Sequence, residues 1–159
     1  MEEYKKKIID TINDFYVDCI DEFKEAELKI ANDSKFRKIF KKKDYGSNIE
    51  VLRNCKKNTR SLKFPTGDIP KGDNETKELL RQTESCIRQF NRVCDSYIQM
   101  QLALQKKADG GEMSYHDYRL VYSRSQEDRV ALNSELKELD ILYSDYIENE
   151  DIDVYEFIE

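Results

Sequence analysis

The longest amphipathic segment of the chain spans residues 73–111 and reads DNETKELLRQTESCIRQFNRVCDSYIQMQLALQKKADGG. It contains no glycine or proline before its terminal glycine pair, and apolar or small residues recur at intervals of three and four, the spacing of one helix face. Asp73 or Asn74 suits the N-cap of such a helix. We therefore expect a long helix over about 75–108. Its predicted seam comprises Leu79, Thr83, Cys86, Phe90, Val93, Tyr97, Met100 and Leu104.

Two similar segments flank this helix. Apolar residues follow the same spacing in the N-terminal part, which predicts a helix over about 2–32. After the glycine pair, Ser114 can cap a third helix over about 114–147. The coiled-coil-like seams repeat every 3.5 residues, which favours packing at shallow crossing angles in a bundle.

Seven consecutive polar residues, SRSQEDR at 123–129, interrupt the apolar stripe of the last predicted helix. Because no glycine or proline enforces a break there, we favour a continuous helix. Its polar residues would then form a buried layer, with Arg124 and Arg129 facing acids such as Asp14 or Asp18. They could also mark a groove left open for a ligand or partner. The alternative is a kinked, exposed stretch.

Residues 34–72 connect the first two long helices and differ from them in composition. The segments 36–40 and 45–62 suit short amphipathic helices, whereas 64–74, with two prolines and two glycines, suits a loop. We predict an all-α fold, an antiparallel bundle of three long helices with one or two short basic helices in this crossover. Counted together, these elements make a three- to four-helix bundle.

The length of 159 residues suits one domain, which we place at 1–147, followed by an acidic-hydrophobic tail at 148–159. Hydrophobic and charged residues each make up 38% of the chain, and the net charge is only −6, so the chain can fold. The chain lacks the apolar core of a secretory signal and any apolar run long enough for a transmembrane helix. Its four cysteines form no CxxC pair. We expect a reduced, cytoplasmic protein.

Sequence motifs that carry catalysis or bind cofactors are missing. There is no phosphate-binding glycine loop and no HExxH motif, and His116 is the only histidine. A Cys/His zinc site or a carboxylate-histidine di-metal centre needs more ligands than this. We therefore predict no enzyme activity, no cofactor and no metal, and keep an enzyme with an unrecognised site as a weaker alternative.

Charge is distributed unevenly along the chain. Residues 35–71 hold twelve Lys or Arg against three acids, whereas 127–159 has a net charge of −10. Such a segment either forms a solvated basic face or binds a polyanion such as nucleic acid, because phosphate binding requires clustered cations. The polyanion alternative places the contact in the crossover at 35–63. Its candidate residues are Lys38, Lys41, Lys42, Lys43, Arg53, Lys56, Lys57 and Arg60.

The leading functional hypothesis is a non-catalytic protein-interaction module of the adaptor, chaperone or inhibitor type. The last helix is rich in tyrosine, which offers contact area with a polar tip, and the tail mixes acids with large apolar residues. The partner is unknown and could be a second copy in a homodimer. Candidate contact residues are Tyr143, Tyr146, Ile152, Val154, Tyr155 and Phe157.

Overall fold

The computed structural model describes residues 2–35, 44–65, 67 and 69–150, and side chains are described for these except at 33–35. The all-helical prediction is confirmed, since the described residues contain helices and no strand. The elements are α1 (Glu3–Asp14), η1 (Phe15–Asp21), α2 (Glu22–Lys35), α3 (Tyr45–Arg60), α4 (Asn74–Ala108) and α5 (Tyr115–Asn149).

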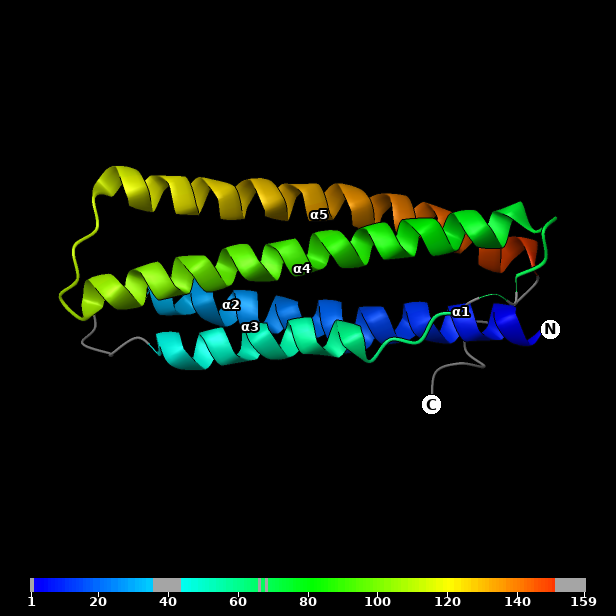
Figure 1. The fold of residues 1–159 in the computed structure, drawn as a ribbon, viewed down its shortest axis with the longest axis horizontal. Helices are drawn as coiled ribbons and strands as arrows, with labels where there is room; N and C mark the ends of the chain where they lie inside the picture. Colours follow the sequence, from blue (N-terminus) through cyan, green and yellow to red (C-terminus); the bar gives the residue numbers. More distant parts are fainter. Residues whose placement is uncertain (1, 36–43, 66, 68, 151–159) are drawn as a thin grey trace.

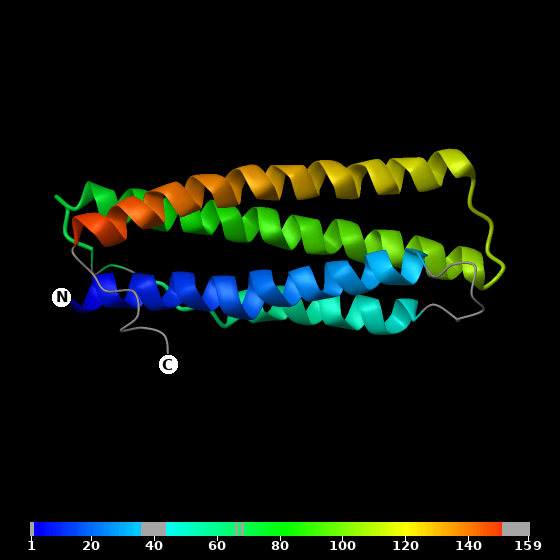
Figure 2. The ribbon, with the colours of Figure 1, turned by 180° about the vertical axis from the view of Figure 1, so that it is seen from behind.

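In the described residues the helices form four rods, which lie side by side (Figure 1, Figure 2). The elements α1, η1 and α2 form one continuous rod, which runs in the same direction as α4, while α3 and α5 run in the opposite direction. The rod α4 lies between α3 and α5 and packs along both. The sixteen-residue α3 is a full member of the bundle, because its buried residues join the common core.

The N-terminal rod departs from the regular helix that its apolar spacing predicts. The segment η1 is π-helical over Phe15–Asp21, where each turn is wider than in an α-helix. Phe15, Cys19 and Ile20 still face the core within it. The side-chain amide of Asn58 on α3 donates to the backbone carbonyl of Asp18 at 3.0 Å. The neighbouring rod therefore supplies a partner to a carbonyl in the widened segment.

Aromatic rings form the centre of the core. The ring of Phe90 meets Phe15 and Phe23 edge-on, with centroids 5.8 Å and 5.7 Å apart, and Tyr97 packs against Phe23 at 5.2 Å. Most of the predicted seam of α4 is buried as expected. Its buried members are Leu79, Thr83, Cys86, Phe90, Val93, Tyr97 and Met100, and Leu104 is half-buried.

Long polar side chains link α5 to the N-terminal rod along its length. Their pairs are Lys5 with Glu150 at 2.8 Å, Tyr143 with Asn13 at 2.8 Å, Arg129 with Glu27 at 2.6 Å, and Tyr16 with Asp140. These contacts set the register between the two rods. No helix in the described part of the chain combines the length and apolar character needed to cross a bilayer.

A hydrogen-bonded network closes the end of the bundle where α4 begins. Asp73 is the N-cap of α4 and accepts from the backbone amide of Thr76 at 3.1 Å and from its hydroxyl at 2.7 Å. The Tyr4 hydroxyl donates to the same carboxylate at 2.6 Å. The Thr76 hydroxyl oxygen also lies 3.0 Å from the hydroxyl oxygen of Tyr146, so the network joins α1, α4 and α5.

We expect Asp73→Ala to lower the free energy of unfolding by about 2–3 kcal/mol, because it removes a cap and leaves two hydroxyl donors without an acceptor. Asp44→Ala is the matched control. Asp44 caps α3 and accepts from the backbone of Ser47, so its loss should cost only about 1 kcal/mol. Urea unfolding at pH 7 measures both values, and equal losses would contradict the network.

The same network has an expected pH dependence. Burial opposes ionisation of Asp73, but hydrogen bonds from Tyr4 and Thr76 outweigh it and hold its pKa below the ordinary value. Its stabilising effect is therefore complete above the unfolded pKa of about 3.9 and is lost as the pH falls through the folded pKa. The difference between wild type and Asp73→Ala should shrink at pH 3.

Candidate functional site

The two tyrosines proposed as partner contacts lie within the bundle. Tyr146 has an exposed fraction of 0%, and its hydroxyl bonds Thr76 in the end network. Tyr143 is half-buried, its hydroxyl donates to Asn13, and burial raises its pKa to about 12. Both side chains therefore hold helices together and do not form a free contact surface. The other four candidates, Ile152, Val154, Tyr155 and Phe157, lie outside the described residues.

A different set of aromatic side chains is exposed at the start of α5. Tyr115, Tyr118, Arg119 and Tyr122 follow an i, i+3, i+4, i+7 spacing, so they share one side of the helix, which we term the α5 tyrosine face. Tyr115 and Tyr122 are 75% and 46% exposed. The rings of Tyr118 and Tyr122 stack with centroids 6.2 Å apart, and the Arg119 guanidinium lies 5.9 Å from the centroid of the Tyr115 ring.

The sequence analysis did not single out this face, because the tyrosines at both ends of the last helix follow the same helical spacing. The available signal was the polar run that follows Tyr122, which separates the first two turns from the apolar stripe beyond it. In the structure the core side of α5 is occupied by Ser125, Leu132 and Leu139. Within the α5 tyrosine face, Tyr115, Arg119 and Tyr122 are exposed and Tyr118 is half-buried.

The polar run itself lies on a continuous helix, as expected, since α5 is unbroken from Tyr115 to Asn149. The partner expected for Arg129 was wrong. Its guanidinium bonds Glu27 of α2 at 2.6 Å, and the Tyr97 hydroxyl donates to the same carboxylate at 2.8 Å. Arg124 is exposed. The run therefore contributes one part-buried ion pair between α2 and α5, not the pairing with Asp14 or Asp18.

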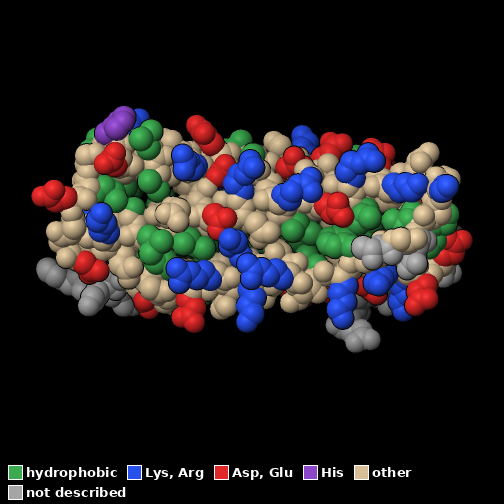
Figure 3. Space-filling model, viewed as in Figure 1, with side chains coloured by type: hydrophobic (Ala, Val, Ile, Leu, Met, Phe, Trp, Pro, Cys, Tyr) green, Lys and Arg blue, Asp and Glu red, His purple; other side chains and the backbone are tan. Residues whose placement is uncertain are grey.

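The basic candidates divide into two groups. Lys38, Lys41, Lys42 and Lys43 lie outside the described residues, whereas Arg53, Lys56, Lys57 and Arg60 lie on α3. These four line a groove between α3 and α4 with a volume of about 390 Å³, which we term the α3–α4 groove. Lys and Arg side chains gather over this part of the surface (Figure 3).

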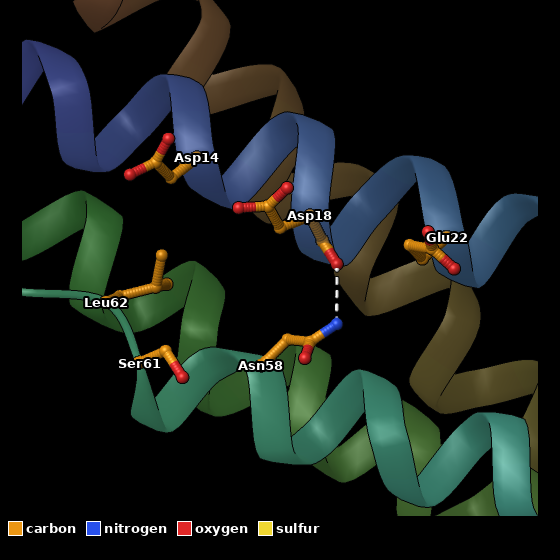
Figure 4. A pocket seen from close by; sticks show the side chains of 6 residues that line it. All are labelled: Asp14, Asp18, Glu22, Asn58, Ser61 and Leu62. Carbon is orange, nitrogen blue, oxygen red and sulfur yellow. Dashed lines mark hydrogen bonds between the residues drawn. The ribbon is translucent and has the colours of Figure 1, made fainter.

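At the opposite edge of α3, the N-terminal rod places the reverse charge. Asp14, Asp18 and Glu22 line a recess of about 330 Å³ between the N-terminal rod and the end of α3 (Figure 4). Burial and the neighbouring carboxylates Asp18 and Asp10 raise the pKa of Asp14. Within the described ranges no three His, Cys, Asp or Glu side chains are arranged to hold a metal ion. The helix α3 thus separates an acidic recess from a basic groove.

Comparisons with protein-family models, curated proteins and solved structures find no match. The α5 tyrosine face and the α3–α4 groove are two described surfaces that combine exposure with a distinct chemistry.

Nucleophilic catalysis through a thiol and the histidine has no geometric support. His116 is exposed in the first turn of α5, whereas Cys19, Cys55, Cys86 and Cys94 are all buried in the core. Burial raises the thiol pKa of Cys55 to about 11 and those of Cys19 and Cys86 to about 12, which is opposite to the shift that activates a nucleophile. These cysteines serve as small core residues.

Proposed function

We propose that the chain is a non-catalytic protein-interaction module that contacts its partner through the α5 tyrosine face. The observation that carries the proposal is the exposure of Tyr115 and Tyr122, at 75% and 46%, beside a guanidinium on one side of a helix. Large aromatic rings left in water gain free energy when a partner covers them.

The contacts within the face support this role. Stacking of Tyr118 on Tyr122 and the approach of Arg119 to the Tyr115 ring restrict these side chains before any partner arrives. Side chains that are already ordered lose less conformational entropy on binding. Tyrosine and arginine are also among the residue types enriched at the energetic centres of protein interfaces.

The face indicates the chemistry of its partner. The i, i+3, i+4, i+7 spacing suits a helix that lies along a groove or against another helix. The partner surface would place apolar area against the tyrosine rings and a carboxylate against Arg119, which presents a planar fork of donors. A second copy of this chain is one such partner.

Site-specific photocrosslinking tests the proposal. A benzophenone amino acid replaces Tyr122 in one variant and Ile141 in the control, because Ile141 is an exposed apolar residue on α5 outside the face. We expect one adduct of defined mass from position 122 in extract of the source cells, and none from position 141. Adding Arg119→Glu should abolish the adduct through charge repulsion.

The fold of each variant is checked by urea unfolding, where the exposed Tyr122 should change stability by less than about 0.5 kcal/mol. An adduct mass equal to two chains would identify a second copy as the partner. Equal crosslinking from positions 122 and 141, or an adduct that survives Arg119→Glu, would contradict the proposal.

A further inference from the structure

The α3–α4 groove is concave and mainly basic. Its lining includes Arg53, Lys56, Lys57 and Arg60 from α3, together with Asp95 and Ile98 from α4. Three of these cations, Arg53, Lys57 and Arg60, are exposed and form no ion pair among the described residues. Unpaired cations in a recess concentrate positive potential, since the surrounding protein screens them less than open water does.

The helix α4 forms the second wall of the groove, and two contacts hold it against α3. Lys56 bonds Asp95 at 2.6 Å, and the Thr59 hydroxyl donates to the side chain of Asn91 at 3.2 Å. Arg88 and Arg92 each precede one of these α4 residues by three positions, so they lie one turn away on the same side of α4. Both are exposed. Neither forms an ion pair with another described residue, so exposed cations flank the groove on both helices.

We infer that the α3–α4 groove binds a single strand of nucleic acid through its phosphodiester backbone. Arg53, Lys57 and Arg60 rise along α3 by about 6 Å and then about 4.5 Å, so a linear polyanion can contact them in succession. Arginine also matches phosphate with a planar pair of donors. No aromatic side chain is among the described residues that line the groove, so binding does not depend on base stacking and should show little sequence preference.

The surroundings of the groove do not suit a membrane surface. A helix that lies on a bilayer presents an apolar face beside its cations. The exposed large apolar side chains of the described chain lie on η1, α2 and α5, and none lies on α3 or α4. A flat bilayer also cannot enter a recess between two helices, whereas a strand can.

This site is independent of the α5 tyrosine face, since the two share no residue. The test uses fluorescence polarisation of the full chain with a labelled 20-nucleotide mixed-sequence RNA at several salt concentrations. The five exposed cations Arg53, Lys57, Arg60, Arg88 and Arg92, which form no ion pair within the described part of the chain, predict a slope of about −3.5 for log affinity against log salt. The variant Arg53→Gln/Lys57→Gln/Arg60→Gln should reduce the slope to about −1.4 and the affinity about 100-fold at 0.1 M salt.

The charge-matched control is Lys6→Gln/Arg124→Gln/Lys137→Gln, which removes three exposed cations from α1 and α5. It should leave the slope unchanged and affect affinity far less than the groove variant. Unfolding curves of both variants should match wild type, because every changed side chain is exposed.

Asp95→Asn provides a test in the opposite direction. It removes the carboxylate from the groove and releases Lys56 from its ion pair, which adds a cation for phosphate. Affinity should rise about fivefold at 0.1 M salt, and the slope should steepen by about 0.7. A purely structural role for the groove would give no gain, since breaking the pair would only weaken the fold.

Four outcomes would overturn the inference. They are no RNA binding at low salt, equal losses in the groove and control variants, tighter binding to vesicles of anionic phospholipid than to RNA, and tighter binding to a polyglutamate peptide. The last two would assign the groove to a membrane surface or an acidic protein.

Discussion

Phe90→Ala is expected to lower the free energy of unfolding by about 3–5 kcal/mol. The Phe90 side chain is fully buried at the centre of the core, where its ring contacts Phe15 of η1 and Phe23 of α2. Truncation removes these edge contacts and leaves a cavity between rods that cannot collapse without moving a whole helix. Urea unfolding followed by helical circular dichroism measures the loss.

Phe64→Ala is the matched control for this prediction. It makes the same chemical change at a half-buried position in the connection that follows α3 along the chain. The loss of unfolding free energy should therefore be well below that of Phe90→Ala. Phe90→Leu should recover part of the loss by refilling the cavity. A cost below about 1 kcal/mol for Phe90→Ala would show that the aromatic centre is not the main packing layer.

The four thiols should be protected from labelling by more than a factor of about 1,000 relative to the unfolded chain. Burial raises the pKa of Cys55 to about 11, so about one thiol in a thousand is ionised at pH 8, against about a quarter at the ordinary pKa of about 8.5. The core also excludes the reagent. Reaction with a chromogenic disulfide reagent, with and without 6 M guanidinium, measures this protection.

Thiol labelling also depends on the core directly. If labelling requires global unfolding, Phe90→Ala should accelerate it about 1,000-fold, since each 1.4 kcal/mol raises the open population tenfold. Rapid labelling of one thiol in wild type would instead show local opening at that helix. Because the unfolded thiols ionise first, stability should fall as the pH rises from about 8.5 toward 11.

The sequence determined which residues of α4 face the core. The spacing of threes and fours in α4 placed Phe90 and Cys86 inside, and the two-glycine turn separated α4 from α5. Local patterns such as these depend on helix geometry within one segment, and so they can be read without knowing the neighbours. The caps at Asp73 and Ser114 are local in the same sense.

The candidate sites depended on contacts between segments. Tyr146 and Tyr122 belong to one tyrosine-rich helix, yet the first is covered by α4 while the second is exposed. Arg129 pairs with Glu27, 102 residues away along the chain, because α2 and not η1 lies opposite it. No periodicity within a segment encodes such choices.

Only the tertiary structure decided where the charges meet. The sequence placed Arg53, Lys57 and Arg60 in a basic segment, but their groove exists because α4 lies beside α3. The same packing sets Asp95 against Lys56 and puts the acidic recess at the other edge of α3. Helix-forming tendency is local, whereas the surface that a bundle exposes is set by which rods pack together and in what register.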